Sequence, residues 1–369
     1  MGFLMDQFKK GLEGVVALDT QISFIDGVQG ILKYRGIEIE KLVDLSYDAV
    51  SYLLIYGKIP DAGELNRFSK KLRKERNVNL HLLNMLKFCD FENESLDVLR
   101  TAISVYAHFD EDPHDISEQA NARKTIRLIA LFPTIVAAFY RMAHGLELIP
   151  PDPSLSHGEN FLYMLRGTLP TALEAEAMEK DFILSAEHEL NPSTFALRIT
   201  ASTLSDLHSA IISGLCTLKG SLHGGARKGV MDMLDDIGSP DNIAAYVQEH
   251  LEHKQKIMGF GHRVYKTYDP RALIYKDIAM KVAMEKSNGH WFDLAKEIES
   301  VMYHEMVENK HKPIYPNVDF YSGVLYKDLG IPSYLATSVF AIGRISGWIA
   351  HCMEQYSDNR VIRPRAHFI

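Results

Sequence analysis

Helix start and stop signals follow one another along almost the whole chain, and this pattern limits the fold more than any other feature of the sequence. The segment SYDAVSYLLIYG begins with Ser46, a residue type that caps helix starts, and finishes with Gly57, a residue type that ends helices. Further along, Leu96, Leu99 and Ile103 recur at helical spacing. The same signals predict helices over residues 63–75, 122–144, 159–166, 171–189, 193–219 and 335–355.

Residues 15–37 carry the one clear strand signal in the sequence. Short β-favouring runs flank Asp26 and Gly30, which is typical of a small hairpin or ribbon. The sequence therefore predicts an all-α fold with a small N-terminal β-ribbon. Because 369 residues are many for a single core, we expect two domains. A large helical domain would span 1–224 and resume at 331–369, and a smaller helical domain would span 225–330, where the helices are shorter and more charged.

Charge and cysteine content exclude several classes of protein. The net charge of −8 argues against a nucleic-acid partner, which would require a concentrated basic face. The three cysteines lie far apart without a CxxC motif, which fits a reducing cytoplasm and indicates no metal site. The N-terminus lacks the apolar core of a signal peptide, and the apolar run 129–140 is too short to cross a bilayer. We therefore expect a cytoplasmic protein without a membrane partner.

The segment MGFGHRVYKTYDPR (258–271) has a composition that neither a buried helix nor a strand favours. It places His262 directly after a glycine and adds three cations, Arg263, Lys266 and Arg271. Its glycines permit backbone angles and close approaches that other residues resist. A loop that exposes backbone N–H groups beside such side chains can hold an anion. The alternative for this segment alone is a surface loop with scattered charge.

Three further loops have a similarly unusual composition. LSAEHELNPST places His188 at an expected helix end beside Asn191, and KGSLHGGA places His223 before two glycines. PNVDFYSG places Asp319 in an apolar, aromatic setting just after a proline. A single histidine is more often a surface or core-filling residue. Three histidines at Gly- or Pro-bounded helix ends indicate a site.

Several better-defined motifs are absent from the sequence. GFGHRV lacks the third glycine of a dinucleotide loop, HEMVE lacks the second histidine of a zinc-protease helix, and neither GxxxxGK[ST] nor GxSxG occurs. What remains is a carboxylate, histidines and the arginines Arg271, Arg344 and Arg363. Each arginine alone could be a surface ion-pair partner, but together they could clamp a dicarboxylate. A carboxylate that removes a proton beside a carbonyl, with histidines that stabilise the enol, suits carbon–carbon bond formation without a metal or redox cofactor.

These motifs resemble those of the citrate synthase family. GFGHRVYKTYDPR looks like the signature stretch of the family, and KGSLHGGA, PNVDFYSG and IRPRA (362–366) fall in the family's order. The likeness covers essentially the whole chain, including DGVQGILKYRG, EHELNPST and SVFAIGRISGWIAH. It is greatest to the archaeal and Gram-positive bacterial branch.

The resemblance implies a homodimer of mainly helical subunits whose two domains close over the substrates. It implies that His223 donates to the thioester carbonyl of acetyl-CoA, that Asp319 removes the methyl proton, and that His262 polarises the ketone of oxaloacetate. The resulting citryl-CoA is cleaved by water, at the entrance of the tricarboxylic acid cycle. The residues implied to hold oxaloacetate are His188, Asn191, Arg271, Arg344 and Arg363, the last reaching across from the partner subunit. Acetyl-CoA is a co-substrate rather than a bound cofactor, and the residues expected near CoA are Lys256, Met258, Gly259, Phe260, Gly261, Arg263, Lys266 and Lys312.

Two alternatives remain open at this point. A 2-methylcitrate synthase, or an enzyme of dual specificity, would use propionyl-CoA in the same chemistry, and one methyl group is worth only roughly 1–3 kcal/mol of discrimination. A non-catalytic helical scaffold dimer belongs to a different class. That class would be expected to lose His223, His262 or Asp319, and all three are present.

Overall fold

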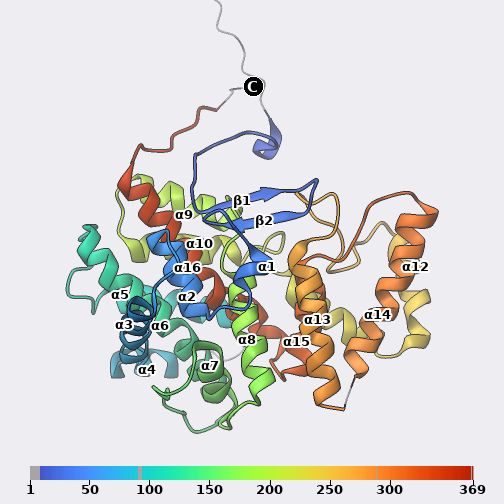
Figure 1. Cartoon of the computed structure of the whole chain (residues 1–369), viewed down its shortest axis with the longest axis horizontal. Coiled ribbons are helices and arrows are strands. Elements are labelled where there is room, and N and C mark those ends of the chain that lie inside the picture. The colour runs from blue at the N-terminus through green and yellow to red at the C-terminus, as the bar shows by residue number, and fades with distance from the viewer. Residues whose placement is uncertain (1–8, 90–93, 288, 367, 369) are drawn as a thin grey trace, which may run out of the picture.

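The structure, a computed structural model of the chain, describes residues 9–89, 94–287, 289–366 and 368. Helices make up most of the described residues, so the all-α prediction is confirmed (Figure 1). The α-helices are α1 (Ile39–Leu42), α2 (Tyr47–Tyr56), α3 (Ala62–Lys74), α4 (Leu80–Lys87), α5 (Ser95–Ala107), α6 (Glu118–Ala143), α7 (His157–Arg166), α8 (Ala172–Ser185), α9 (Pro192–Ser202), α10 (Leu207–Leu218), α11 (Ala226–Ile237), α12 (Ile243–Glu252), α13 (Pro270–Glu285), α14 (His290–Met302), α15 (Val318–Asp328) and α16 (Ala336–Ser357). Short helical turns η1 (Lys10–Leu12), η2 (Pro240–Asn242), η3 (Tyr303–Asn309) and η4 (Ser333–Leu335) complete the helical elements.

The predicted N-terminal ribbon is confirmed, with a short third strand added. The strands β1 (Ser23–Asp26), β2 (Ile31–Tyr34) and β3 (Ile37–Glu38) form one antiparallel sheet in chain order. The β1–β2 turn rests on the loop that precedes α13, where Lys266 N–H donates to Gly27 O at 2.8 Å. A Cβ atom on Gly27 would lie 2.3 Å from the carbonyl oxygen of Val264, so this approach requires glycine. The ribbon therefore supports the loop from one side.

Capping residues set the ends of α2 as the sequence predicts. Ser46 accepts a hydrogen bond from Ala49 N–H at the N-terminus of the helix. Gly57 ends the helix with a φ of 76°, a left-handed conformation that glycine adopts without strain. The start and stop signals read from the sequence are therefore confirmed for α2.

The prediction of one helix over 193–219 is wrong, because the chain breaks between α9 and α10. Leu204 has a φ of 62° in this break. Asp206 then starts α10 by accepting a hydrogen bond from Ser209 N–H at 3.0 Å. Helix-favouring side chains lie on both sides of the break, so the apolar pattern continues through it and conceals the Asp cap.

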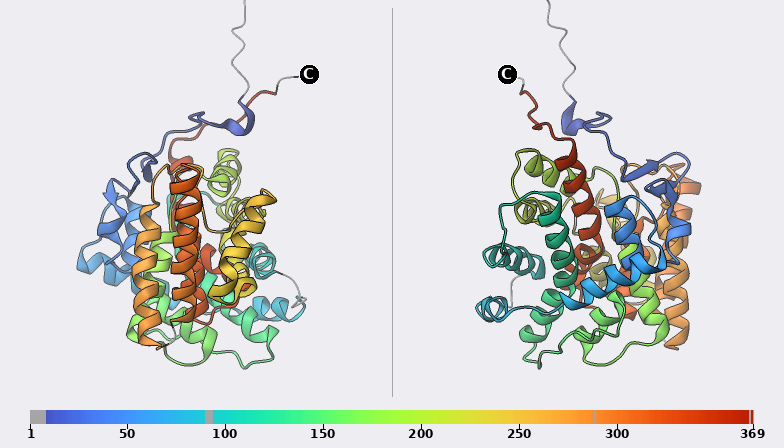
Figure 2. Two further views of the ribbon diagram at one scale, coloured as in Figure 1. Left: turned by 90° about the vertical axis from the view of Figure 1, so that its right-hand side faces the viewer. Right: turned by 60° about the vertical axis from the view of Figure 1, so that its left-hand side comes forward.

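Two long helices form the centre of the core. α16 is buried along nearly its whole length and packs against α2, α6, α8 and α9 (Figure 2). α6 continues through Pro133 and is long and apolar enough to cross a membrane by length and composition. However, 78% of its most apolar window is buried inside the protein, as expected of a central core helix.

α16 approaches the end of α8 very closely at two glycines. A Cβ atom on Gly343 would lie 2.7 Å from the carbonyl oxygen of Phe182, and one on Gly347 would lie 2.2 Å from that of Ala186. These oxygens belong to the backbone just before His188. The glycines therefore allow α16 to carry Arg344 up to the His188 segment.

We expect Gly347→Ala to lower the free energy of unfolding by about 3 kcal/mol, the upper part of the range for overpacked cores, because the clash is with backbone. Denaturant titration measures this change. Gly63→Ala on α3 is the matched control, since its Cβ would meet only side-chain ends at 3.2 and 3.3 Å, and we expect it to be neutral or stabilising. An unchanged unfolding midpoint for Gly347→Ala would show that α16 moves away from α8 at little cost.

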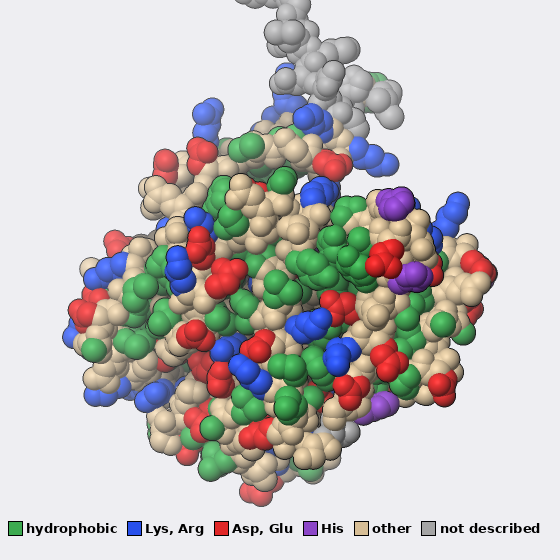
Figure 3. All heavy atoms as spheres, turned by 45° about the vertical axis from the view of Figure 1, so that its right-hand side comes forward, with side chains coloured by type: hydrophobic (Ala, Val, Ile, Leu, Met, Phe, Trp, Pro, Cys, Tyr) green, Lys and Arg blue, Asp and Glu red, His purple; other side chains and the backbone are tan. Residues whose placement is uncertain are grey.

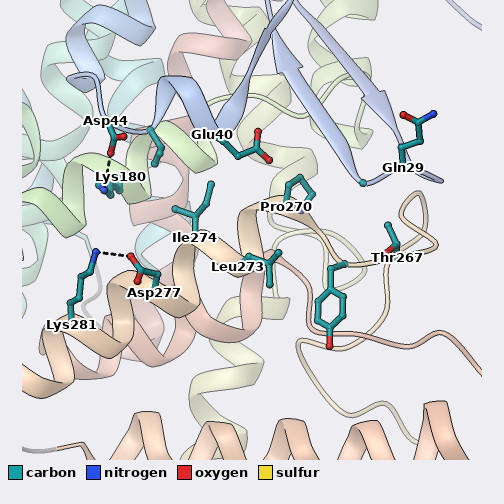
Figure 4. A pocket seen from close by; sticks show the side chains of 13 residues that line it. Gln29, Glu40, Asp44, Lys180, Thr267, Pro270, Leu273, Ile274, Asp277 and Lys281 are labelled. Atoms are coloured by element: carbon teal, nitrogen blue, oxygen red, sulfur yellow. Dashed lines mark hydrogen bonds and ion pairs between the residues drawn. The ribbon is translucent and has the colours of Figure 1, made fainter.

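The helices form two groups in space. Figure 1 shows α12, α13 and α14 on one side of the molecule and α2–α7 on the other. An open cleft of about 720 Å³ lies where α1, α8 and the β1–β2 turn face α13 and the loop before it (Figure 4). Gln29, α1 and Lys180 of α8 line one wall, and Thr267, Tyr268 and α13 line the other. The cleft thus lies at the predicted domain boundary, and the division at residues 225 and 330 stays a prediction.

Candidate active site

Two of the predicted motifs are joined through their backbones. Gly261 N–H donates to Tyr315 O at 2.9 Å, and Asn317 N–H donates to Gly259 O at 2.8 Å. The Asn317 side-chain amide adds a bond to Gly261 O at 2.9 Å. Gly259 has a φ of 79°, and a Cβ on it would lie 2.9 Å from Phe320. The loop before His262 and the start of α15, which carries Asp319, are therefore neighbours.

The His262 ring is fixed in one tautomer by its own loop. Its Nδ1 lies 3.0 Å from Val264 N–H and 3.1 Å from Tyr265 N–H. Backbone amides can only donate, so Nδ1 accepts and the proton of the neutral ring sits on Nε2. Burial, followed by the charge of Arg271, lowers the pKa of His262 to about 4. The side chain is therefore a neutral N–H donor at physiological pH.

The His223 ring is fixed in the opposite tautomer. Ser193 N–H lies 3.3 Å from its Nε2, and the Ser193 hydroxyl lies 2.8 Å from the same atom. Because the amide must donate, Nε2 accepts and the ring proton sits on Nδ1. Burial, followed by the charge of Arg344, lowers the pKa of His223 to about 4. A second neutral N–H donor is therefore present.

Asn191 acts as the N-cap of α9. Its Oδ1 accepts from Thr194 N–H at 3.2 Å and lies 2.7 Å from the Ser193 hydroxyl oxygen, whose one proton is shared between Oδ1 and His223 Nε2. Its Nδ2 donates to the Thr194 hydroxyl at 3.0 Å and to His188 O at 3.4 Å. These bonds use the whole amide within its own turn. They place Ser193 beside His223, and the predicted contact of Asn191 with a substrate stays a prediction.

His188 lies beside His262. Their ring centroids are 5.4 Å apart, and His188 Nε2 lies 3.3 Å from the Tyr265 hydroxyl. Burial, followed by the charges of Arg271, His262 and Arg344, lowers the pKa of His188 well below its ordinary value. His188, His262, Arg271 and Arg344 therefore occupy one neighbourhood.

The two buried arginines have different partners. Arg271 Nε and Nη2 bond the Asp269 carboxylate at 3.0 and 2.8 Å. Arg344 donates from Nε to Ser185 O at 2.6 Å and lies over the Phe340 ring, and it forms no ion pair with any described residue. Burial lowers the pKa of Arg344 to about 10. A buried guanidinium without a paired carboxylate is stabilised by an anionic ligand.

Asp319 lies in the first turn of α15 at the edge of this neighbourhood. Asn317 accepts a bond from Asp319 N–H at 2.9 Å, which fixes the start of the helix. Arg227 Nε lies 3.6 Å from Asp319 Oδ1, and the Asp319 side chain is 21% exposed. Burial raises the pKa of Asp319, and the charges of Arg227 and Arg271 oppose the shift. The carboxylate is therefore placed to act as a base of raised basicity.

The structure does not bring Arg363 to these residues within one chain. Arg363 is exposed on the C-terminal tail, where the neighbouring Ile362 N–H donates to the Ser202 hydroxyl at 3.1 Å. Ser202 ends α9, about 15 Å along the helix from Asn191 at its start. Figure 1 shows the tail leading away from the body of the protein.

The residues predicted to contact CoA fall into two sets. Met258, Gly259, Phe260 and Gly261 form the backbone-joined loop, where Phe260 lies against Phe320 with a ring separation of 4.6 Å. The cations of the prediction are all exposed, and they are Lys256, Arg263, Lys266 and Lys312. On the face shown in Figure 3, basic and acidic side chains are intermixed rather than gathered into a single basic patch.

Sequence reasoning missed four residues that position this site. They are Ser193, Arg227, Tyr265 and Asp269. Of the four, only Asp269 has a local signal in the sequence, because an aspartate directly before Pro270 and two residues before Arg271 can cap the helix and pair with the arginine. The other three depend on contacts between segments far apart in the chain.

Known proteins resemble this chain over nearly its whole length. The family model for the citrate synthase C-terminal domain matches residues 11–365. Citrate synthase 2 of Bacillus subtilis is 43% identical over 361 residues, 97% of this chain and 95% of the relative. Citrate/2-methylcitrate synthase of the same organism is 36% identical over 364 residues, 98% of this chain and 96% of the relative.

Solved structures give the same result. Citrate synthase of Thermotoga maritima has a TM-score of 0.87 and 42% identity, covering 98% of this chain and 96% of that one. Citrate synthase of Thermoplasma acidophilum, solved as a ternary complex with carboxymethyl coenzyme A and oxaloacetate, has a TM-score of 0.92 and 32% identity over 98% and 96%. Fold and relatives together define an enzyme of the acyltransferase type. The chain belongs to the citrate synthase family, as its motifs predict, and its full-length relatives support a citrate synthase function.

Proposed function

We propose that this protein condenses acetyl-CoA with oxaloacetate and hydrolyses the citryl-CoA formed, releasing citrate and CoA in the cytoplasm as part of the tricarboxylic acid cycle. The observation that carries the proposal is the pair of half-buried, neutral histidines with opposite tautomers, His223 and His262. Each presents one N–H to a carbonyl oxygen, and Asp319 supplies the base. The family membership and the ternary complex of the Thermoplasma enzyme support the choice of substrates.

In the first step, Asp319 removes a proton from the methyl group of acetyl-CoA. The electron pair of the broken C–H bond forms the enol double bond, and His223 Nδ1–H donates to the thioester oxygen that gains charge. A neutral donor with a pKa of about 4 is suited to this role, because it strengthens its hydrogen bond as charge develops without needing a proton from solvent.

In the second step, the enol carbon attacks the ketone carbon of oxaloacetate. His262 Nε2–H donates a hydrogen bond to the ketone oxygen as it gains charge. That oxygen then takes up one proton, which balances the one that Asp319 removed, and becomes the hydroxyl of citryl-CoA. Water then attacks the thioester carbonyl, the C–S bond breaks, and CoA leaves as a thiol. Closing the two predicted domains, 225–330 against 1–224 and 331–369, would exclude water until the condensation is complete.

The unpaired cation of Arg344 supports a dianionic keto acid as the second substrate. Arg344 and Arg271 supply guanidinium groups, and His188 supplies a ring nitrogen, in the neighbourhood of His262. The charge of Glu187 acts on Arg344, but Glu187 is paired with His351, so a substrate carboxylate would supply the direct partner that Arg344 lacks among the described residues. Arg363 of the partner subunit in a homodimer would complete the clamp.

The direct test is release of CoA thiol from acetyl-CoA in the presence of oxaloacetate by the purified protein. Release that depends on both substrates is expected, and its absence would favour a non-catalytic scaffold. Parallel assays with propionyl-CoA test the alternative that the Bacillus citrate/2-methylcitrate synthase relative raises. A higher kcat/KM for propionyl-CoA would replace the proposed substrate and leave the site chemistry unchanged.

We expect Arg363→Leu to weaken oxaloacetate binding about 30-fold, the equivalent of about 2 kcal/mol for one lost charge contact. Mixing chains locates this contact. A dimer of one Arg363→Leu chain and one Asp319→Asn chain would contain one intact site if Arg363 crosses the interface. A 1:1 mixture refolded together should then recover about a quarter of wild-type activity for a two-fold symmetric dimer. If the activity of the mixture does not exceed that of the separate variants, Arg363 contributes to the site of its own chain or to no site.

A further inference from the structure

A buried cation, Arg227, lies next to Asp319, and no step of the proposed reaction assigns it a role. Arg227, in the first turn of α11, is only 2% exposed. Its Nη1 bonds Asp181 Oδ1 at 2.8 Å and the Tyr326 hydroxyl at 2.5 Å. Its guanidinium also faces the rings of Tyr275 and Tyr326, with centroid distances of 5.6 and 4.8 Å. The head group is therefore fixed on one side by α8, α13 and α15.

Asp181 anchors this arrangement and is itself fully buried. The Tyr275 hydroxyl donates to Asp181 Oδ1 at 2.8 Å, and the Tyr326 hydroxyl donates to Asp181 Oδ2 at 2.8 Å. With the bond from Arg227, both carboxylate oxygens are satisfied. Asp181 thus offsets the charge of Arg227 and prevents its side chain from turning.

The remaining edge of the guanidinium points to the proposed base. Arg227 Nε is buried, forms no hydrogen bond with the described residues, and lies 3.6 Å from Asp319 Oδ1. A buried N–H without a hydrogen-bond partner costs free energy. The Asp319 carboxylate is the charged group that this N–H faces, just beyond hydrogen-bond range.

Among the charged groups around Asp319, Arg227 has the largest effect on the pKa of the Asp319 carboxyl. Arg227 opposes the effect of burial most strongly, Arg271 follows, and Asp269 acts in the opposite direction. Arg271 is already bonded through two of its nitrogens to Asp269. The charge of Arg227 is therefore the main one that keeps the Asp319 carboxyl ionised when the site is buried.

We propose that Arg227, anchored by Asp181, is a positioning residue that keeps the Asp319 carboxylate ionised and oriented for proton abstraction. This inference rests on the proposed role of Asp319 as the base. It assigns a task to the Asp181–Arg227–Asp319 row, which links α8 and α11 to α15.

The test uses the full-length protein and the pH dependence of kcat/KM for acetyl-CoA. Arg227→Gln alone would leave Asp181 buried and unpaired, so the main variant is the double change Arg227→Gln with Asp181→Asn. An Asn at 181 can still accept from one tyrosine hydroxyl and donate to the other. Without the cation, the acid limb of the profile should move up by about one pH unit, the lower end of the effect of an arginine on a neighbouring carboxylate. We expect kcat to fall, while the affinity for oxaloacetate should stay unchanged.

A matched control removes one positive and one negative charge from the same helix at the surface. Lys228 and Asp232 form an i,i+4 pair at 2.6 Å, so Lys228→Gln with Asp232→Asn should leave the profile in place. Arg227→Lys keeps the charge and should return the acid limb toward its wild-type position. Asp181→Asn alone leaves the cation less compensated and should move the acid limb down, the direction opposite to that of the double variant.

The outcomes separate this inference from the proposed function. Activity that survives Asp319→Asn would overturn both. If Asp319→Asn is inactive, a folded double variant whose acid limb and kcat match the wild type would overturn the role of Arg227 alone. If the double variant does not fold, the single variant Asp181→Asn provides the test. An acid limb at the wild-type position in that variant would overturn the role of Arg227, and a downward shift would support it.

Discussion

Asp319→Asn is expected to lower kcat about 1000-fold, within the range that a positioned general base contributes. The amide cannot accept the methyl proton, yet it has nearly the shape of the carboxylate. The backbone N–H of residue 319 still donates to Asn317, so the start of α15 is preserved. Oxaloacetate lies on the arginine and histidine side of the site in the proposed arrangement, so its affinity should change by less than about twofold, the effect expected when only the base is lost.

CoA thiol release measures kcat, and calorimetric titration with oxaloacetate measures the affinity. Asp277→Asn provides the matched control, since it makes the same change at an exposed carboxylate that pairs with Lys281 at 2.7 Å. We expect that control to keep wild-type turnover. An Asp319→Asn enzyme that turns over at a similar rate would remove Asp319 from the base role, and one that no longer binds oxaloacetate would instead place Asp319 in the keto-acid clamp.

Much of the fold could be predicted because it depends on local signals. The ends of α2 follow from Ser46 and Gly57, whose capping chemistry acts within one turn. The break between α9 and α10 could not be predicted in the same way, because the apolar pattern continues on both sides. Asp206 is a capping residue type, but the sequence alone does not show that the chain leaves the helix before it.

In the candidate site, too, local signals could be predicted from the sequence, and contacts between distant segments could not. His223 and His262 could be selected because glycines adjoin them, and glycine marks backbone that bends or approaches closely. Their protonation could not be predicted, since it depends on Ser193 N–H in one case and on the turn after His262 in the other. Arg227 follows the KGSLHGGA motif directly. In sequence it is indistinguishable from a surface arginine in a helix, and only the buried contact with Asp181 reveals its position.

Replacing His262 by Gln is expected to lower kcat/KM about 300-fold, the range seen when one oxyanion-stabilising donor is removed. A glutamine can offer an amide N–H, but its flexible side chain is not held by Val264 N–H and Tyr265 N–H as the imidazole is. The loss should appear in kcat/KM for both substrates, because the donor acts on the ketone oxygen as carbon–carbon bond formation begins. A variant with normal kcat/KM would exclude His262 from polarising the ketone.

The pH dependence of stability supplies a second and independent test of His262. Its folded-state pKa is lowered to about 4 by burial and by Arg271, whereas an unfolded histidine titrates near 6.5. As pH falls from about 6.5 toward 4, the unfolded state binds a proton that the folded state does not, so stability decreases through that window. His262→Gln should therefore show a smaller loss of unfolding free energy between pH 7 and pH 5 than the wild type, as measured by denaturant titration at each pH. An equal slope in both proteins would mean that His262 takes up a proton over the same pH range in the folded and unfolded states. The folded protein would then hold a charged ring below about pH 6.5, and its two N–H donors are incompatible with the two amides that face Nδ1.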